Sequence, residues 1–381
     1  MIERYDAIVI GLGGHGSAAA YHLARRGRRV LGLEQFAPLH EQGSSHGLTR
    51  IIRLAYHEHP SYVPLLRRAY ELWHELESVA DEELLITTGA LEGGPGDGAT
   101  FRGSLAAAEL HDLPHEVLEA ADLERRFGFA NLDPATRAVL QPDGGFLLAE
   151  ETMRAHHAAA TAHGAELRFE EAVTGWEPIG TDGVRVRTAR GSHDADRLVV
   201  CAGAWIRELV PSLATLAVPE RQVLGWFTPK RDTFGPDGFP VFLIDVEGGR
   251  HYYGFPTHAG HGVKLGWYHH FGEVIDPSDA DRTPRPDDEA ALRHFMERYL
   301  PDAAGPTEML RACIFTNTPD EHFVIDHLAD APQVTVASAC SGHGYKFASV
   351  IGEILADLAI DGETAHDIGL FRLDRFGSAA G

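Results

Sequence analysis

Residues 5–16 read YDAIVIGLGGHG, an apolar run that leads directly into the pattern G-x-G-x-x-G. A short, continuous apolar run is typical of a strand buried on both faces of a parallel sheet. Residues 17–26 are rich in Ala and Leu and predict a helix, which Gly27 ends. Residues 30–34, VLGLE, predict a second buried strand. Strand, glycine turn, helix and strand thus follow in the order of a dinucleotide-binding unit.

Each glycine of this pattern has a physical role. Gly11 permits the tight turn, Gly13 lets the backbone approach a pyrophosphate, and Gly16 lets the helix pack closely on the strand. The phosphates would meet free N–H groups at the positive end of the helix dipole. Glu34 ends the second strand, where its carboxylate can accept hydrogen bonds from a ribose diol and disfavours a 2′-phosphate. These residues predict a bound dinucleotide and leave NAD and FAD both open.

Composition excludes several classes of function. The chain has 381 residues, with 33 Lys plus Arg against 56 Asp plus Glu and a formal net charge of −23. This acidity argues against a nucleic-acid partner, which requires clustered basic residues. No apolar run approaches the length of a membrane span, and three cysteines are too few for a disulfide framework. The histidines show no metal-ligand spacing, so no metal site is predicted. We expect a soluble, cytoplasmic protein.

The other segments predict a discontinuous cofactor domain. Helical spacing covers residues 62–78, 150–164 and 349–360, and strands are predicted at 166–169, 172–176, 196–201 and 334–338. The glycine-dense residues 89–103 predict a crossing or a hairpin, and the alternating residues 219–272 predict an antiparallel sheet. We expect an α/β fold whose cofactor domain comprises residues 1–85, 147–215 and 320–381, with a substrate domain of residues 86–146 and 216–319. This arrangement favours an FAD oxidoreductase over a simple NAD dehydrogenase.

Four blocks of sequence carry a resemblance to a known family. They are residues 11–16; residues 44–53, SSHGLTRIIR; residues 253–256, YGFP, with 262–266, GVKLG; and residues 313–323, CIFTNTPDEHF, with 341–347, SGHGYKF. Over essentially its whole length the chain resembles the monomeric sarcosine oxidase family of flavoprotein amine oxidases, which includes N-methyltryptophan and pipecolate oxidases. The resemblance implies a Rossmann-like FAD domain of the glutathione-reductase/D-amino-acid-oxidase type with an inserted, mainly antiparallel substrate domain. It also implies a monomer.

The resemblance further implies that FAD is attached covalently through the sulfur of Cys313. The turn at residues 341–344 would present its N–H groups to the pyrimidine end of the flavin and stabilise negative charge there. The small-residue turn that begins at Ala202 would let the sheet backbone approach the cofactor. The full set of expected cofactor-binding residues is Gly11, Gly13, Gly14, Gly16, Glu34, Ser44, Ser45, Thr49, Arg50, Val173, Ala202, Gly203, Trp205, Cys313, Gly342, His343, Gly344 and Lys346.

By their positions in the family's motifs, Arg53 and Lys346 would bind the substrate carboxylate, because a planar fork and a point charge together hold it in one orientation. Lys264 would lie over the flavin and promote its reaction with dioxygen, since a fixed cation stabilises superoxide. His46 and Arg50 would lie near the flavin. Tyr253 would contact substrate or flavin.

The sequence also departs from the family's pattern. The resemblance implies an active-site histidine at His269 or His270, and the segment 266–271, GWYHHF, is one residue longer than the family's, which leaves both positions open. Phe315 stands where sarcosine oxidases commonly have tyrosine, and Leu48 replaces an acid. With one hydroxyl absent and a bulky Trp267–Tyr268 pair present, the pocket is expected to accept substrates other than sarcosine.

These observations predict an FAD oxidase of secondary amines that carry a carboxylate, such as sarcosine, another N-substituted glycine or a cyclic imino acid. The imine formed would hydrolyse to an aldehyde and an amine, and dioxygen would be reduced to hydrogen peroxide. The alternatives are a flavin dehydrogenase with another acceptor, a flavin-binding subunit without turnover, and a NAD-dependent amine dehydrogenase. The motifs around Cys313 and Lys346 disfavour the last of these.

Overall fold

A computed structural model describes residues 4–380, which form three sheets and eight α-helices. In the first, eight-stranded sheet, β1 (Arg4–Ile10) pairs in parallel with β2 (Val30–Leu33) and with β12 (Gly191–Val200). Its other strands are β9 (Glu166–Arg168), β10 (Val173–Ile179), β11 (Gly183–Thr188), β18 (Val324–Leu328) and β19 (Ala331–Ser338). The predicted βαβ unit is therefore confirmed, and segments distant in sequence complete the same sheet.

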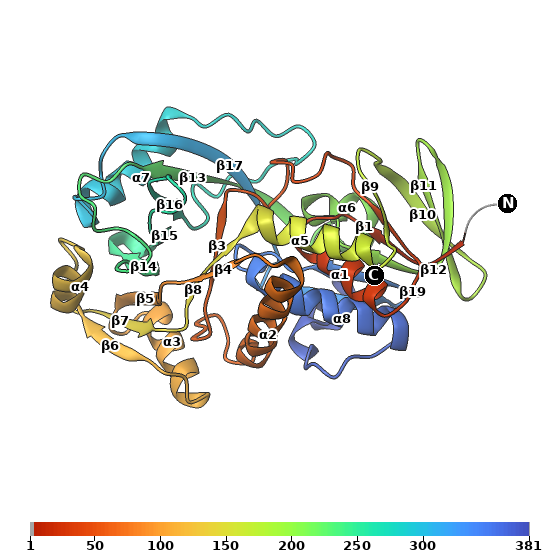
Figure 1. Cartoon of the computed structure of the whole chain (residues 1–381), viewed down its shortest axis with the longest axis horizontal. Coiled ribbons are helices and arrows are strands. Elements are labelled where there is room, and N and C mark those ends of the chain that lie inside the picture. Colours follow the sequence, from red (N-terminus) through yellow and green to blue (C-terminus); the bar gives the residue numbers. More distant parts are fainter. Residues whose placement is uncertain (1–3, 381) are drawn as a thin grey trace.

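Helices cover one face of this sheet. Four helices gather there, with α1, α5 and α8 packed together and α2 against them (Figure 1). They are α1 (Gly14–Arg25), α2 (Tyr62–Ala80), α5 (Ala149–Ala162) and α8 (Ala348–Asp361). Alternate residues of β1 divide between two cores, because Ala7 and Val9 pack beneath the helices and Ile8 and Ile10 pack on the opposite side. The helices predicted at 62–78, 150–164 and 349–360 are confirmed. No helix within residues 4–380 is long and apolar enough to cross a membrane.

The second eight-stranded sheet is mainly antiparallel, as predicted. In order across the sheet its strands are β17 (Thr307–Asn317), β13 (Val218–Phe227), β16 (Val263–Trp267), β15 (Arg250–Phe255), β14 (Val241–Val246), β5 (Ala90–Pro95), β7 (Thr136–Gln141) and β6 (Glu116–Glu119). The pair β14–β5 is parallel. The remaining helices are α3 (Ala99–Leu110), α4 (Ala120–Phe127), α6 (Ile206–Leu209) and α7 (Pro286–Tyr299), of which α3, α4 and α7 pack on this sheet.

The prediction for residues 89–103 is wrong, because they form strand β5 and the start of α3 rather than a crossing or hairpin. The glycines allow close packing instead of a reversal. A Cβ atom on Gly93 would lie 2.7 Å from the Cβ of Ala138 on the neighbouring strand. A Cβ atom on Gly94 would lie 2.7 Å from the Cβ of Asp245, one strand away on the other side.

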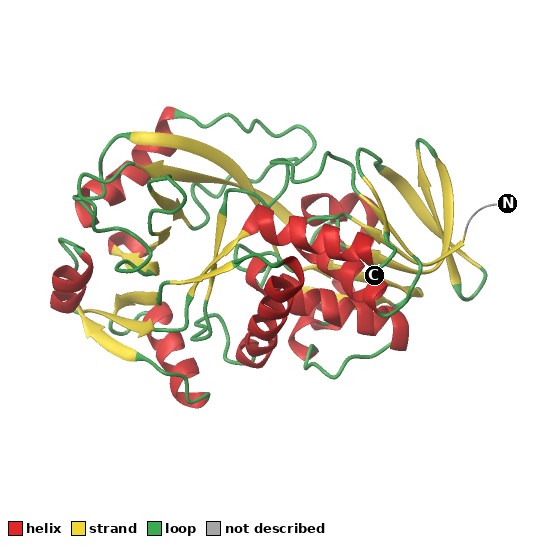
Figure 2. Ribbon diagram, in the orientation of Figure 1, coloured by secondary structure: helices red, strands yellow, loops and turns green. Residues whose placement is uncertain are grey.

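A small third sheet lies between the two large ones (Figures 1 and 2). It consists of β3 (Thr49–Ile52), β8 (Gly145–Leu148) and β4 (Leu85–Thr87), all antiparallel. Strand β3 carries Arg50, and Arg53 follows its last residue. This placement brings two arginines into the space between the sheet with the glycine turn and the sheet that contains Cys313.

Candidate active site

The turn between β1 and α1 is packed so closely that two of its glycines have no room for a side chain. Gly11 has φ of +85°, and a Cβ atom on it would lie 2.4 Å from the carbonyl oxygen of Cys201. A Cβ atom on Gly16 would lie 1.7 Å from the carbonyl oxygen of Gly11. Gly13 and Gly14 line a cavity of about 320 Å³ that extends from this turn. The N-terminus of α1 therefore opens onto the cavity, as a pyrophosphate site requires.

Glu34 lies at the end of β2 and lines the same cavity. Its Oε2 accepts the N–H of Leu12 at 2.9 Å and its Oε1 accepts that of Phe36 at 3.1 Å. Burial by itself would raise the pKa of Glu34, but hydrogen bonds from His40 and from these N–H groups outweigh it and lower the pKa. The carboxylate is therefore ionised and held in place where a ribose diol could bind it.

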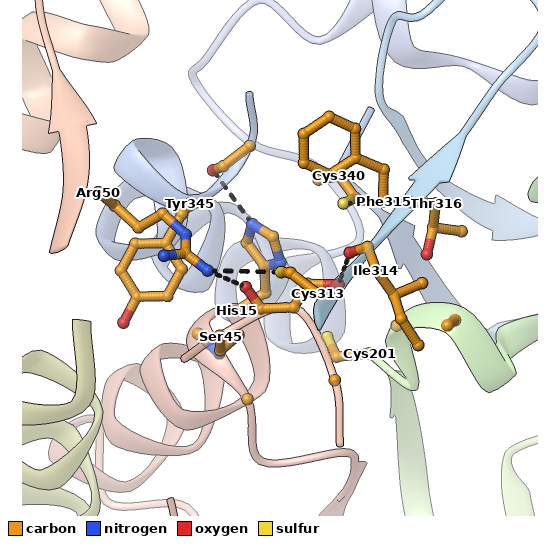
Figure 3. A pocket seen from close by; sticks show the side chains of 18 of the residues that line it. His15, Ser45, Arg50, Cys201, Cys313, Ile314, Phe315, Thr316, Cys340 and Tyr345 are labelled. Atoms are coloured by element: carbon orange, nitrogen blue, oxygen red, sulfur yellow. Dashed lines mark hydrogen bonds between the residues drawn. The ribbon is translucent and has the colours of Figure 1, made fainter. Parts of the chain in front are cut away.

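Cys313 lies on β17, and its Sγ faces the cavity 3.8 Å from Nη2 of Arg50 (Figure 3). Arg50 is fixed by donating to the carbonyl oxygens of Ser44 at 2.7 Å and Thr49 at 2.9 Å. Burial raises the pKa of the Cys313 thiol, and Arg50 acts in the opposite direction. The Cys313 thiol thus lies next to a cation at the wall of the cavity.

Lys264, on β16, is only 2% exposed and lines the cavity. Its Nζ donates to the carbonyl oxygens of Gly47 at 2.8 Å and Thr49 at 2.7 Å and to Oγ1 of Thr49 at 3.1 Å. It also lies 4.2 Å from the ring centroid of Phe255. Burial, followed by Arg50, lowers the pKa of Lys264 well below its ordinary value. These contacts hold the amine in one position at the cavity wall.

Arg53 is buried and held by two carboxylates. Its Nε donates to Glu92, and its Nη2 donates to both oxygens of Glu58 at 2.8 Å. Burial would lower the pKa of Arg53, but Glu58 and Glu92 outweigh it and raise that pKa further. Among residues 4–380, Nη1 has no hydrogen-bond partner, so one end of the guanidinium remains available. The cation is thus permanent and nearly immobile.

Lys346 and Arg53 both lie next to the ring of Tyr56. The Arg53 guanidinium lies 4.4 Å and the Lys346 amine 5.1 Å from the ring centroid of Tyr56. Nζ of Lys346 donates to the carbonyl oxygen of His343 at 2.6 Å. Burial and then Arg53 lower the pKa of Lys346 well below its ordinary value. A bound anion would reverse this effect, because it would stabilise the charged amine.

Most of the residues predicted from the sequence line this one cavity. They are Gly11, Gly13, Gly14, Glu34, Ser44, Ser45, Arg50, Arg53, Val173, Ala202, Gly203, Trp205, Tyr253, Lys264, Cys313, Gly342, His343, Gly344 and Lys346. Three others lie behind its wall. Gly16 packs on Gly11, Thr49 accepts from Lys264, and His46 is 1% exposed, with neither ring nitrogen hydrogen-bonded and burial lowering its pKa to about 3.

The predicted active-site histidine is not at the cavity. His269 contacts Glu220 and Glu321, of which only Glu321 lines the cavity, and the alternative, His270, contacts Asp288. Strand β16 ends at Trp267, and both histidines have positive φ, 60° and 38°, so the alternation of a strand does not apply to them. Tyr268 lines the cavity instead, donating to the carbonyl oxygen of Ser341 and lying 5.2 Å, centroid to centroid, from Phe315.

The sequence analysis missed several residues at the second sheet's end of the cavity. His57, Glu58 and His251 line it, and Glu92 lies directly behind them. A signal was present in Glu92, an acid in the otherwise apolar and glycine-rich stretch 90–94. Such an acid in a strand requires a partner once it is buried. The partners of Glu92 are Arg53 and His57, and they could not be predicted because they depend on the tertiary position of β5, which lies beside β14.

Comparison with known proteins agrees with this site. The family described as FAD dependent oxidoreductase matches residues 6–358. The chain is 45% identical over 384 residues to monomeric sarcosine oxidase from Streptomyces avermitilis, covering 100% of both chains. It is 36% identical to N-methyl-L-tryptophan oxidase from Yersinia pestis, covering 98% of this chain and 99% of the other. The chain belongs to the sarcosine oxidase family of FAD dependent oxidoreductases.

Membership of the sarcosine oxidase family confirms the predicted flavoprotein amine oxidase and its FAD dependence. The fold agrees as well. The structure of NikD, an amino acid oxidase of nikkomycin biosynthesis, superposes with a TM-score of 0.85 at 28% identity, covering 97% of each chain. The residues present fit FAD, because glycines at positions 11 and 16 permit the close-packed turn at the cavity, and Glu34 is an ionised acceptor next to it.

Proposed function

We propose that this enzyme oxidises a secondary amine bearing a carboxylate, such as sarcosine or another N-substituted glycine, to an imine that hydrolyses to an aldehyde and an amine. The observation that carries the proposal is the pair of buried basic side chains, Arg53 and Lys346, which both lie next to the ring of Tyr56 in the same cavity as the glycine turn and Cys313. A carboxylate between them would fix the substrate in one orientation.

Arg53 would bind the substrate carboxylate through Nη1, which has no hydrogen-bond partner within residues 4–380. Glu58 and Glu92 keep the guanidinium fixed, so little side-chain entropy is lost when the substrate binds. Lys346 supplies a second donor. Burial and Arg53 lower its pKa, and the negative charge of a substrate carboxylate would act in the opposite direction and stabilise the charged amine. The two side chains thereby distinguish amino acids from simple amines.

In this proposal FAD is bound at the glycine turn and Glu34 and is attached through Cys313. The flavin supplies the two-electron acceptor chemistry, and the protein supplies orientation and charge. Arg50 beside Cys313, and the turn at Gly342 and Gly344, would hold negative charge near the pyrimidine end. Lys264 would place a fixed amine where dioxygen is reduced to hydrogen peroxide.

The proposal is tested by mixing the purified flavoprotein with sarcosine and other N-methylated amino acids without oxygen. Loss of the flavin's visible absorbance with an N-methyl amino acid, and none with the corresponding amine that lacks a carboxylate, is the expected result. Retention of the colour with every N-methyl amino acid would show that the enzyme does not oxidise this class. Admitting air then separates an oxidase from a dehydrogenase, because only an oxidase returns to the oxidised spectrum and forms one peroxide per imine.

A further inference from the structure

Three neighbouring strands of the second sheet present polar side chains toward the cavity. Leu243 on β14 is opposite Glu92 on β5 and Tyr253 on β15, and Asp245 is opposite His251. Alternate residues of a strand share a face, so these five side chains lie on one face of the sheet. Leu243, His251 and Tyr253 line the cavity directly. This face therefore forms the wall of the cavity beyond the Arg53–Lys346 pair.

Two imidazoles on this wall are each backed by a carboxylate. His57 Nδ1 lies 2.6 Å from Oε2 of Glu92, and His251 Nδ1 lies 2.5 Å from Oδ1 of Asp245. The two rings are 5.7 Å apart, centroid to centroid. Glu92 is itself held by Ser104, whose Oγ donates to it at 2.7 Å. Two histidine–carboxylate pairs thus stand side by side at one end of the cavity.

The Nε2 atoms of both rings remain for a ligand. Each carboxylate accepts the proton of Nδ1, which fixes the tautomer and leaves Nε2 as the free polar atom. Neither Nε2 has a hydrogen-bond partner within the described residues 4–380, and neither is a fully buried atom. Both side chains are 17% exposed, and both line the cavity. A group on the substrate is the natural partner for these two nitrogens.

We propose that His57 and His251 form a second polar subsite, which binds a neutral group that both donates and accepts hydrogen bonds, such as a hydroxyl or a primary amide, on the side chain or N-substituent of the amino acid oxidised. This inference rests on the proposed function. It means that the enzyme prefers polar N-substituted amino acids to sarcosine and to their aliphatic counterparts.

The two rings offer complementary hydrogen bonds. Burial would lower the pKa of His57, but Glu58 and Glu92 outweigh it and raise the pKa, which favours the protonated ring, whose Nε2 donates. In the tautomer of His251 whose Nδ1 proton is directed to Asp245, Nε2 is an acceptor. A hydroxyl can accept from the first and donate to the second. An aliphatic group would leave both nitrogens without water or a partner.

The charges around the subsite favour a neutral group over a second carboxylate. Glu58, Glu92 and Asp245 are opposed by Arg53, by His57 and by Lys346 when it is protonated beside the substrate. The substrate's own carboxylate already adds one negative charge to this balance. A second one would be buried without a matching cation, which is costly.

The test uses matched pairs of substrates that differ only in the polar group. They are N-methylserine against N-methyl-2-aminobutyrate, N-methylhomoserine against N-methylnorvaline, N-methylasparagine against N-methylleucine, and N-(2-hydroxyethyl)glycine against N-propylglycine, with N-methylaspartate as the charged analogue. We expect kcat/KM to favour the polar member of at least one pair by about tenfold or more, because the apolar member leaves buried donors unpaired. A smaller ratio in every pair, or faster oxidation of N-methylaspartate than of N-methylasparagine, would overturn the subsite.

Variants test the contribution of His251 and its carboxylate to this preference. In His251→Phe the polar-to-apolar ratio of kcat/KM should fall toward one, and Asp245→Asn, which keeps the ring but not its ionised partner, should lower the ratio in the same direction. The matched control is His74→Gln, an exposed histidine on α2, which should keep the ratio of the parent enzyme. An unchanged ratio in both cavity variants would contradict the assignment.

The panel also separates this inference from the proposed function. If aliphatic and polar N-methyl amino acids reduce the flavin equally well, the proposed function stands and only the subsite is wrong. If none of them reduces the flavin, both are wrong.

Discussion

Arg53 and Glu92 form an ion pair in which both side chains are almost completely buried, 1% and 2% exposed. Arg53 is the side chain expected to bind the substrate carboxylate, so an acid already competes for it in the folded protein. Glu92 also orients His57 through its other oxygen. The buried carboxylate of Glu92 therefore contacts both Arg53, which is expected to bind the acid group of the substrate, and His57, which is proposed to bind its polar side chain or N-substituent.

Removing the charge of Glu92 should strengthen binding of anions and weaken the fold. We expect Glu92→Gln to lower the dissociation constant of a simple carboxylate inhibitor such as acetate several-fold, because a competing negative charge is lost. We also expect it to lower the free energy of unfolding by roughly 1–3 kcal/mol, since a hydrogen-bonded charge is replaced by an amide. Titration of the flavin spectrum and urea unfolding measure the two effects. Glu109→Gln, on the exposed side of α3, serves as the control, and weaker acetate binding in Glu92→Gln would contradict the account.

Cys313 should determine whether the flavin leaves the protein on denaturation. Acid precipitation of the parent enzyme should give a yellow pellet and a colourless supernatant, because a thioether survives unfolding. Cys313→Ser should release the colour into the supernatant. Cys340→Ser provides a matched control, since Cys340 lines the same cavity and should leave the pellet yellow. A colourless pellet from the parent enzyme would exclude the covalent link.

Lys264 should affect the reaction with dioxygen more than the reaction with the amino acid. We expect Lys264→Met to slow reoxidation of the reduced enzyme by about 10²–10³-fold, the usual effect of removing one fixed group that stabilises developing charge. The rate of anaerobic reduction by substrate should change far less. Stopped-flow absorbance resolves the two half-reactions. Lys230→Met, on the exposed surface, is the control, and equal slowing of both half-reactions would indicate a structural defect instead.

The rate of substrate oxidation should rise toward alkaline pH. A secondary amine reacts in its neutral form, and the ordinary pKa of such an amine lies well above 7. Arg53 stays charged throughout because Glu58 and Glu92 raise its pKa, so its own contribution to carboxylate binding is kept as the pH rises. The measurement is kcat/KM from pH 6 to 10 in the parent enzyme. A profile that is flat or falls over this range would count against the proposed chemistry.

His269, although outside the cavity, should contribute to stability in a pH-dependent way. Hydrogen bonds to Glu220 and Glu321 raise its pKa to about 9, above its unfolded value near 6.5. The contribution is thus fully present below pH 6.5 and is lost as the pH rises through 9. Its side chain is 36% exposed, so we expect His269→Gln to cost only about 1 kcal/mol at pH 6 after solvent screening and nothing at pH 10. Urea unfolding at both values checks this, with His294→Gln on α7 as the control. A cost equal at both pH values would refute it.

The sequence alone predicted the parts of the site that local rules determine. The glycine turn, the strand that ends at Glu34, and the helices α2, α5 and α8 follow from apolar periodicity and from the conformations that glycine allows. The motifs around Arg53, Cys313 and Lys346 predicted residues that line one cavity. The segment after Lys264 could not be assigned in this way, because the strand ends at Trp267 and the next residues turn back with positive φ.

The order of elements and the family motifs were thus determined by residues close together in the chain. The partners of Arg53 were not, because Glu92 lies on a strand 39 residues away whose position depends on its pairing with β14. The same holds for His57 and His251, which meet only when β3 and the second sheet pack against each other. Contacts between residues far apart in the chain depend on how whole faces of sheets and helices are buried against each other. A local sequence pattern therefore does not predict which buried acid will contact which buried base.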